Sequence, residues 1–246
     1  MKRFENKLIA DIVLNNINTS EVFKEFNIDY SIEGNKNFLT VCEHKNIDSK
    51  KIINKLVAAH KDVYYLQNYN SWKLDFLIEF LSEIHHNYKE ENILILKQYS
   101  KKVADLYSKQ YPELLEVNNL IQGVSEEILE HMKNEETILF PYLKELLKLK
   151  ETKVKIKKSA LPKIKSIDDF EDEHFKIRLV FNRIAQLTKN YTIPKNVCDS
   201  FKLLFTRLEK FDNELQDHIH IENNILFPKA KELERKVLAQ DKSVLA

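Results

Sequence analysis

The chain has 246 residues, 43% of them hydrophobic, which is enough for a sizeable core in one large domain or two smaller ones. Its 39 Lys and Arg residues nearly balance 38 Asp and Glu residues, so the net charge of +1 gives no long-range field that would attract nucleic acid or an anionic membrane. Only two glycines occur, which indicates few tight hairpin turns and a mostly helical protein.

Two cysteines, Cys42 and Cys198, are too few for a disulfide framework or a thiolate metal site. The first residues lack the uninterrupted apolar stretch of a secretory signal, and no run approaches the roughly 18–20 apolar residues of a membrane span. We therefore expect a soluble, cytoplasmic protein with no nucleic-acid or membrane partner.

The N-terminal part is predicted to be a separate small helical domain, residues 1–66. Within it, Thr19 and Asp48 are expected to cap two helices, because both residue types accept hydrogen bonds from the first backbone N–H groups of a helix. The polar residues 67–71 suggest a linker to the rest of the chain.

Residues 72–240 are predicted to form one antiparallel four-helix bundle, so the fold class is all-α. Residues 148–166 hold eight lysines and little periodicity, and we interpret them as a solvated loop between two helical hairpins. Ser166 and Asp169 form a capping signature at the start of the third helix. The expected helices run over about 72–109, 112–149, 166–189 and 194–236.

One sequence pattern occurs twice, 87 residues apart. HMKNEETILFPYLKEL begins at His131 and HIHIENNILFPKAKEL begins at His218. In each copy a glutamate follows four positions later, at Glu135 and Glu222, and residues i and i+4 share one face of a helix. The proline inside each ILFP predicts that the helix kinks or restarts about two turns beyond its histidine.

An earlier histidine precedes each copy of the pattern, His85 by 46 residues and His174 by 44. His85 shares its helical stripe with apolar residues four and eight positions before it, so we expect it to face the core. The adjacent His86 lies about 100° further round the helix and is expected on the polar flank.

The four histidines and two glutamates predict a metal site rather than a coincidence. A single inward histidine is more often an ordinary core residue, but an unpaired carboxylate in the core costs several kcal/mol and needs a cation. Helical bundles build metal sites from facing helices. Six ligands exceed the need of one tetrahedral zinc and suit two metals that share two carboxylates. Imidazole with carboxylate favours iron, with manganese or zinc as substitutes, and leaves positions open for oxygen or nitric oxide.

Three further glutamates stand close to the candidate ligands in the sequence. Glu127 and Glu214 each precede a histidine of the repeated pattern by four residues, and Glu173 directly precedes His174. They are candidates for hydrogen bonds to the ligands or for a polar route for protons or metal. Ordinary surface acids are the alternative, and the sequence leaves both interpretations open.

These segments resemble the hemerythrin-like di-iron domain of the RIC (repair of iron centres) family. The resemblance is carried by IHHNY, HMKNEETILFP, EDEHF and HIHIENNILFP, in this order and at these separations. It implies two iron ions per chain with one histidine ligand from each helix. It also implies two bridging glutamates, so the ligand set would be His85, His131, His174, His218, Glu135 and Glu222.

The segment EVFKEFNIDYSIEGNKNFLTVCEHKNID resembles the short N-terminal domain of the same family, which carries Cys-Cys-Gly-Gly after Asp-Tyr. Here Asp29 and Tyr30 are followed by Ser-Ile-Glu-Gly, residues 31–34, so both thiols are absent. Functions of the family that need this cysteine pair are therefore not expected, and Cys42 is interpreted as a small packed residue. The resemblance also implies a homodimer.

The resemblance implies a di-iron stress protein that repairs iron–sulfur clusters damaged by nitrosative or oxidative stress, by supplying iron to the damaged proteins. One alternative is a redox enzyme that turns over nitric oxide or oxygen at the open coordination positions. Another is an oxygen- or iron-sensing binding module. The sequence does not decide whether the protein is an enzyme. The remaining alternative is a metal-free bundle, whose folding and stability would not depend on iron or on a chelator.

Overall fold

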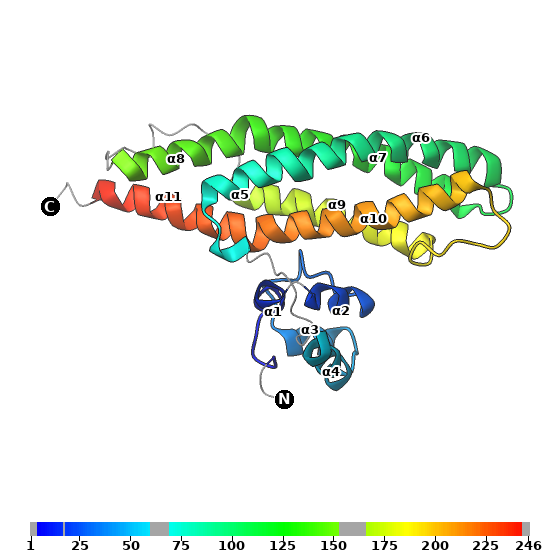
Figure 1. Ribbon diagram of the computed structural model, residues 1–246, viewed down its shortest axis with the longest axis horizontal. Helices are drawn as coiled ribbons and strands as arrows, with labels where there is room; N and C mark the ends of the chain where they lie inside the picture. The colour runs from blue at the N-terminus through cyan, green and yellow to red at the C-terminus, as the bar shows by residue number, and fades with distance from the viewer. Residues whose placement is uncertain (1–3, 17, 60–68, 153–165, 243–246) are drawn as a thin grey trace. The chain divides into compact units, whose positions relative to one another are not determined.

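The computed structural model describes residues 4–16, 18–59, 69–152 and 166–242 (Figure 1). These residues form helices, and an isolated bridge between Leu8 and Asn37 is the β-pairing recorded among them. The predicted all-α class is therefore confirmed. The chain divides into two compact units, Met1–Leu77 with Gln216–Lys229, and Ile78–Leu215 with Ala230–Ala246.

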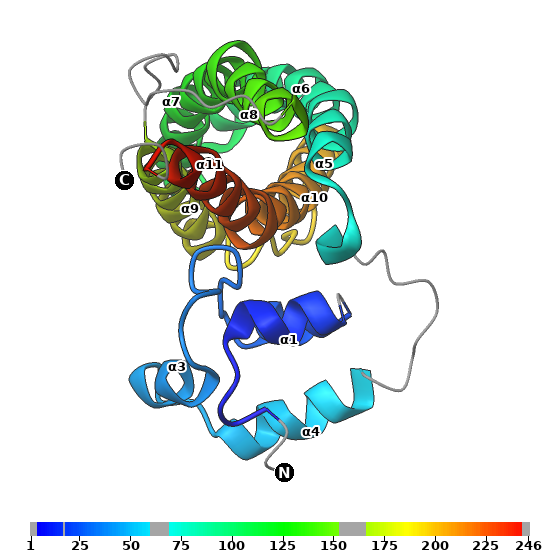
Figure 2. The ribbon, with the colours of Figure 1, turned by 90° about the vertical axis from the view of Figure 1, so that its left-hand side faces the viewer.

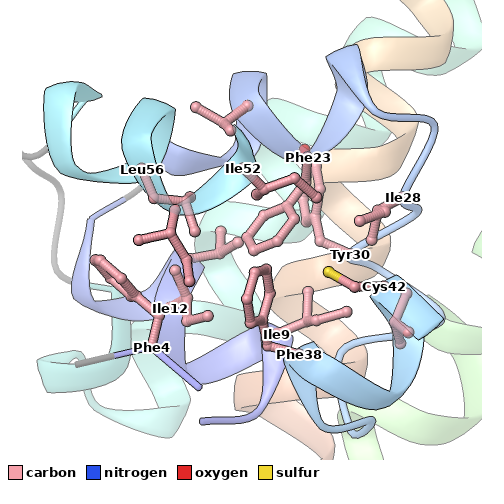
Figure 3. Close-up of a cluster of buried hydrophobic side chains, with 14 residues drawn as sticks. Phe4, Ile9, Ile12, Phe23, Ile28, Tyr30, Phe38, Cys42, Ile52 and Leu56 are labelled. Carbon is pink, nitrogen blue, oxygen red and sulfur yellow. The ribbon is translucent and has the colours of Figure 1, made fainter. Parts of the chain in front are cut away.

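The first unit contains a group of short helices around one hydrophobic core. Phe23, Tyr30 and Phe38 are fully buried there, and the side chain of Cys42 lies among them (Figure 3). The helices are α1 (Ile9–Asn15), α2 (Thr19–Glu25), α3 (Phe38–His44) and α4 (Ser49–Ala59).

One of the two caps expected in this unit is present. Asp48 accepts a hydrogen bond from the backbone N–H of Lys50 at 3.0 Å, as a residue that caps α4 should. The prediction for Thr19 was wrong, because Thr19 is itself the first residue of α2 and its hydroxyl donates back to the carbonyl of Asn16 at 2.6 Å. Asn37 caps α3 by accepting from two backbone N–H groups.

Four long helical stretches follow the short 3-10 helix η1 (Tyr69–Ser71), and they surround a common centre when viewed end-on (Figure 2). The capping box of Ser166 and Asp169 is present at the start of the third stretch. The first stretch is α5 (Leu74–Phe80), η2 (Leu81–His86) and α6 (Asn87–Tyr107); the second is α7 (Glu113–Asn134), η3 (Glu135–Leu139) and α8 (Phe140–Thr152); the third is α9 (Ile167–Leu187); the fourth is α10 (Asp199–Ile221), η5 (Glu222–Leu226) and α11 (Phe227–Lys242).

Within the second unit, α6 packs against α7 and α7 packs against α9. The lysine-rich segment was expected to leave the helix at residue 148, but α8 continues to Thr152, and residues 153–165 lie outside the described part. The same holds for residues 67 and 68 of the predicted linker. The predicted domain boundaries stay predictions.

None of the described helices is both long enough and apolar enough to cross a membrane. The helices of the four stretches each present one buried apolar stripe and one exposed charged face, as amphipathic helices of a water-exposed bundle do. The candidate ligands lie on the buried stripes, so their polar side chains are held away from water.

Candidate metal centre

Six buried side chains converge in two overlapping groups. In each group the ligand atoms lie within 4.8 Å of one another. Glu135 and Glu222 belong to both groups, which is the arrangement that two shared carboxylates require. The first group is His86, Glu135, His218 and Glu222, and the second is His131, Glu135, His174 and Glu222.

The structure places His86, and not the predicted His85, in the first group. His86 is 1% exposed, so its expected place on a polar flank was wrong. His85 is also buried, but its ring packs edge-on against Phe80 at a centroid distance of 4.9 Å. Five of the six predicted ligands belong to the groups, and the sixth is the immediate neighbour of the expected residue.

The reason for this shift is the π-helical turn η2, which begins at Leu81 and ends at His86. An α-helix brings the fourth residue after Leu81 above it, and that residue is His85. A π-turn forms i→i+5 hydrogen bonds, so the fifth residue takes the position above Leu81 instead. Helical periodicity applied at 100° per residue therefore indicates His85, whereas the structure brings His86 into the group.

Two more π-turns begin at the shared carboxylates, η3 at Glu135 and η5 at Glu222. Each is followed by the proline of ILFP, Pro141 or Pro228, which has no N–H to donate to the preceding turn. An irregularity is present just before each of these prolines, in the form of a π-turn. All three π-turns touch a group member, which is where single π-turns often occur in proteins.

The imidazole nitrogens of both groups lie close to the shared carboxylates, and those of the second group also lie close to each other. His131 Nε2 lies 2.8 Å from His174 Nε2 and 3.3 Å from Glu135 Oε1. His86 Nε2 approaches the other oxygen of Glu135 at 3.4 Å. His218 Nε2 lies 2.9 Å from Glu222 Oε2. A cation placed among these nitrogen and carboxylate oxygen atoms would be coordinated by both kinds of donor.

Two further glutamates hold the opposite ring nitrogens. The Nδ1–H of His131 donates to Glu173 Oε2 at 2.8 Å, and the Nδ1–H of His86 donates to Glu136 Oε1 at 2.8 Å. A carboxylate at Nδ1 fixes the tautomer in which Nε2 carries the free lone pair, as metal-binding histidines need.

Glu173 was among the residues that the sequence singled out for this purpose, whereas Glu136 was not. Glu136 directly follows Glu135, but it became recognisable only once His86 was known to face inward. Glu127 is exposed on α7 and touches neither group. Glu214 is half-buried, and its charge contributes, after burial itself, to the raised pKa of Tyr88.

The residues fit a pair of iron ions. Glu135 is 0% exposed, and its two oxygens accept no hydrogen bond from the described residues. A carboxylate buried in this way costs several kcal/mol unless a cation compensates it. Imidazole nitrogens and carboxylate oxygens are the donors that iron takes in helical bundles, and two histidines with two shared carboxylates leave coordination positions open.

Comparison with known families assigns both parts of the chain. The Hemerythrin HHE cation binding domain matches residues 85–230, and a Domain of Unknown function (DUF542) matches residues 5–60. The first match covers more than half of the chain and contains every member of both groups.

Curated relatives are similar over nearly the whole of this chain and of their own length. The iron-sulfur cluster repair protein ScdA of Staphylococcus epidermidis is 25% identical over 225 residues, which cover 90% of this chain and 96% of the relative. The ScdA protein of Staphylococcus haemolyticus is 24% identical over 90% of this chain and 96% of its own length. The iron-sulfur cluster repair protein YtfE of Yersinia pestis is 24% identical over 92% and 97%.

Proposed function

The chain belongs to the hemerythrin HHE cation-binding family, and from this we propose that it is a di-iron protein that supplies iron for the repair of damaged iron–sulfur clusters. The observation that carries the proposal is the pair of buried groups that share Glu135 and Glu222. The names of the relatives, which cover both parts of the chain, support the repair role.

In this proposal each iron is held by two histidines and by the two shared carboxylates. We assign His86 and His218 to one iron and His131 and His174 to the other, following the two groups. This differs from the ligand set that the family resemblance implied in one residue, His86 in place of His85. Bound iron supplies an exchangeable metal with open positions for small ligands such as oxygen or nitric oxide.

The protein's own side chains are arranged for reversible binding of the metal. Glu136 and Glu173 hold two imidazoles with their lone pairs turned inward, so little reorganisation is needed when iron enters. Both shared carboxylates are removed from water, which strengthens their attraction for a cation. Without iron the buried carboxylates are therefore electrostatically unfavourable, but the imidazoles already have the orientation that metal binding needs.

The iron would be delivered without the help of a thiol pair. Residues 31–34 contain no cysteine, and Cys42 is 2% exposed in the core of the first unit. Burial, followed by the nearby charge of Glu43, raises the pKa of the Cys42 thiol to about 11, so the reactive thiolate is scarce. We therefore propose that iron handling rests on the histidine and glutamate groups alone.

We propose that the recipients are damaged iron–sulfur proteins of the cytoplasm under nitrosative or oxidative stress. Both cysteines are free rather than paired, which agrees with a reducing compartment. The near-zero net charge suggests recognition of the recipient by local contacts rather than by long-range attraction.

The first experiment is metal analysis and optical spectroscopy of protein purified without oxygen, for the wild type and for Glu135→Ala with Glu222→Ala. We expect two irons per chain in the wild type and their loss in the double variant. Glu127→Ala is the matched control, because it removes an exposed acid from α7, the helix that carries His131. This variant should keep both irons. A wild type without iron after reconstitution, or equal iron in all three proteins, would contradict the proposal.

A transfer assay then separates iron supply from the alternatives. Loaded protein is mixed with an iron–sulfur protein whose cluster has been destroyed by nitric oxide, with sulfide and reductant present. Iron supply predicts that iron leaves this chain as the cluster returns. Sustained consumption of nitric oxide or oxygen with an electron donor, while both irons stay bound, would instead identify a redox enzyme.

A further inference from the structure

The loop formed by residues 29–34, which takes the place of the cysteine motif of the family, contacts the helix segment that carries His218 and Glu222. The loop and the segment 216–224 both belong to the first compact unit. The loop has no thiol, yet Asp29, Tyr30 and Ser31 are all buried. These residues make hydrogen bonds to four positions of the segment and a ring contact with a fifth.

Tyr30 makes the first contact, on the side of His218. Its hydroxyl donates a hydrogen bond to the carboxylate of Asp217, the residue directly before His218. Its ring lies edge-on to His220 at a centroid distance of 5.3 Å and an angle of 75°. The tyrosine is 0% exposed, so this hydrogen bond to a charged acceptor is shielded from water and is of the stronger kind.

Ser31 makes the second contact, on the side of Glu222. Its backbone carbonyl accepts hydrogen bonds from the side-chain amides of Asn223 at 3.3 Å and of Asn224 at 3.4 Å. These are the two residues directly after Glu222 in the π-turn η5. The amide of Asn224 also lies 3.0 Å from His220 Nδ1, so the contacts around Ser31 and Tyr30 are connected.

Asp29 makes the third contact. One of its carboxylate oxygens accepts from the side-chain amide of Gln216 at 2.9 Å and from the backbone N–H of Ser31 at 3.1 Å. The same carboxylate thus holds both the shape of the loop and the start of the helix segment. Together the loop contacts residues immediately before His218 and immediately after Glu222.

Gly34 allows the close approach of the loop to the π-turn. A Cβ atom at this position would lie 2.5 Å from Asn224 Oδ1 and 2.8 Å from the carbonyl oxygen of Tyr30, distances that side chains do not tolerate. Any larger residue would push the loop away from Asn224. The second glycine of the chain, Gly123, has no such neighbour within 4 Å, so the closeness is specific to the loop.

We propose that residues 29–34 brace the π-turn of Glu222 and thereby set the rate at which iron leaves the site. The inference rests on the proposed function, because it requires bound iron. Release needs the ligands on this helix to move away from the metal, and the loop fixes the helix on both sides of them. Residues that hold metal ligands in place commonly change metal affinity by about 10- to 100-fold when altered.

The test compares iron release from the full-length, iron-loaded protein to an excess of a ferrous chelator in the absence of oxygen. Tyr30→Phe removes the hydroxyl and keeps the buried ring, and Gly34→Ala pushes the loop from Asn224. We expect both variants to bind two irons with the wild-type absorption spectrum and to release them about tenfold faster.

Two control variants separate bracing from general loss of stability. Gly123→Ala changes the other glycine, and Ile52→Val removes a buried methyl group from the core of the same first unit while residues 29–34 and all their hydrogen bonds are kept. Both should release iron at the wild-type rate, with the unfolding temperature of every variant measured in parallel. If Ile52→Val accelerates release as much as Tyr30→Phe, the effect is general instability and the brace is overturned.

The outcomes also distinguish this inference from the proposed function. Wild-type release rates in both Tyr30→Phe and Gly34→Ala would overturn the brace and leave the di-iron assignment intact. A wild-type protein that binds no iron would overturn both. Should Gly34→Ala fail to fold, Tyr30→Phe decides alone, because it introduces no new atom.

Discussion

Among single residues, Glu135 shows most clearly why the site needs a cation. It is fully buried, and both of its oxygens face Nε2 atoms of histidines whose Nδ1–H groups are already bound to other glutamates. Without a cation these are acceptors facing acceptors. The iron-free protein therefore carries an unfavourable interaction that only metal or a proton can relieve.

Glu135→Gln should accordingly stabilise the iron-free protein while it weakens iron binding. The amide group can donate to a histidine Nε2, so we expect a gain of about 1–3 kcal/mol in the free energy of unfolding. For a chain of this size, that is a rise of roughly 2–4 °C in unfolding temperature per kcal/mol. Thermal unfolding of both proteins in chelator measures it; a less stable iron-free variant would contradict the argument.

The adjacent histidines His85 and His86 allow the sharpest test of the ligand assignment. Because His86 belongs to a metal group and His85 packs against Phe80, we expect His86→Ala to lose at least one of two irons per chain. His85→Ala should keep both irons. Metal analysis after identical reconstitution decides, and the reverse result would return the ligand role to His85.

The two cysteines should differ strongly in reactivity. Burial raises the pKa of Cys42 to about 11, whereas a hydrogen bond with the side chain of Tyr107 lowers the pKa of Cys198, which is half-buried. At pH 8 we expect one thiol per chain, Cys198, to react promptly with an alkylating reagent and Cys42 to react only after unfolding. Mass spectrometry of the labelled peptides measures this, and rapid labelling of Cys42 would show that its core opens.

The raised pKa of Cys42 also has a defined effect on stability. The folded state holds the thiol protonated above the ordinary value near 9, so this group contributes fully to stability below pH 9. Its contribution is lost as pH rises from about 9 to about 11, because the unfolded chain then releases a proton that the folded chain retains.

At the scale of the elements, the sequence predicts a great deal of the fold because its helices obey local rules. The four long stretches follow from apolar spacing, and the capping box at Ser166 follows from the reach of its hydroxyl to Asp169. The prediction that Thr19 caps a helix was wrong because its hydroxyl donates a hydrogen bond to the backbone carbonyl of Asn16, a contact that no local rule specifies.

The π-turns explain why the candidate site could be predicted only in part. His131 and His218 precede their π-turns, so the i+4 relation to Glu135 and Glu222 holds. His86 is the last residue of the π-turn η2, and the helix there is one residue out of phase with the α-helical period. Nothing in the apolar spacing before this turn marks the additional residue.

Substitution of Gly123 should change the stability of the protein through the helix α7 alone. It lies exposed in the interior of α7, and a Cβ there would meet no atom within 4 Å. Gly123→Ala should therefore stabilise the protein by about 1 kcal/mol, since alanine restricts the unfolded chain more and favours the helix. Thermal unfolding measures the gain, and a loss of stability would mean that α7 is not regular at this point.

At the scale of the whole molecule, the site draws its ligands from segments that are distant in the chain. One group alone combines His86, Glu135 and His218, which are separated by 49 and 83 residues. Such a site exists only in the folded state, so iron binding contributes to folding and the unfolding temperature should depend on free iron. The function and the stability of the bundle are therefore linked through the same six side chains.

The same linkage extends to the loop 29–34, because coupling between two events is reciprocal. If the loop slows the departure of iron from the site that includes Glu222, bound iron must in turn hold the loop. We expect the backbone amides of Ser31 and Glu33 to exchange with deuterium more slowly in the iron-loaded protein than in the iron-free protein. Both amides are hydrogen-bonded to Asp29, so their exchange reports opening of the loop.

Tyr30→Phe supplies the control for this last prediction. It removes the contact to Asp217 and keeps the fold of the first unit, so exchange at the two amides should become nearly independent of iron. Amides of the α4 helix, which takes no part in the hydrogen bonds between the loop and the segment 216–224, should exchange alike in all four samples. Iron-dependent exchange that survives in Tyr30→Phe would mean that the loop senses iron by another route, and that the hydroxyl of Tyr30 does not carry the coupling.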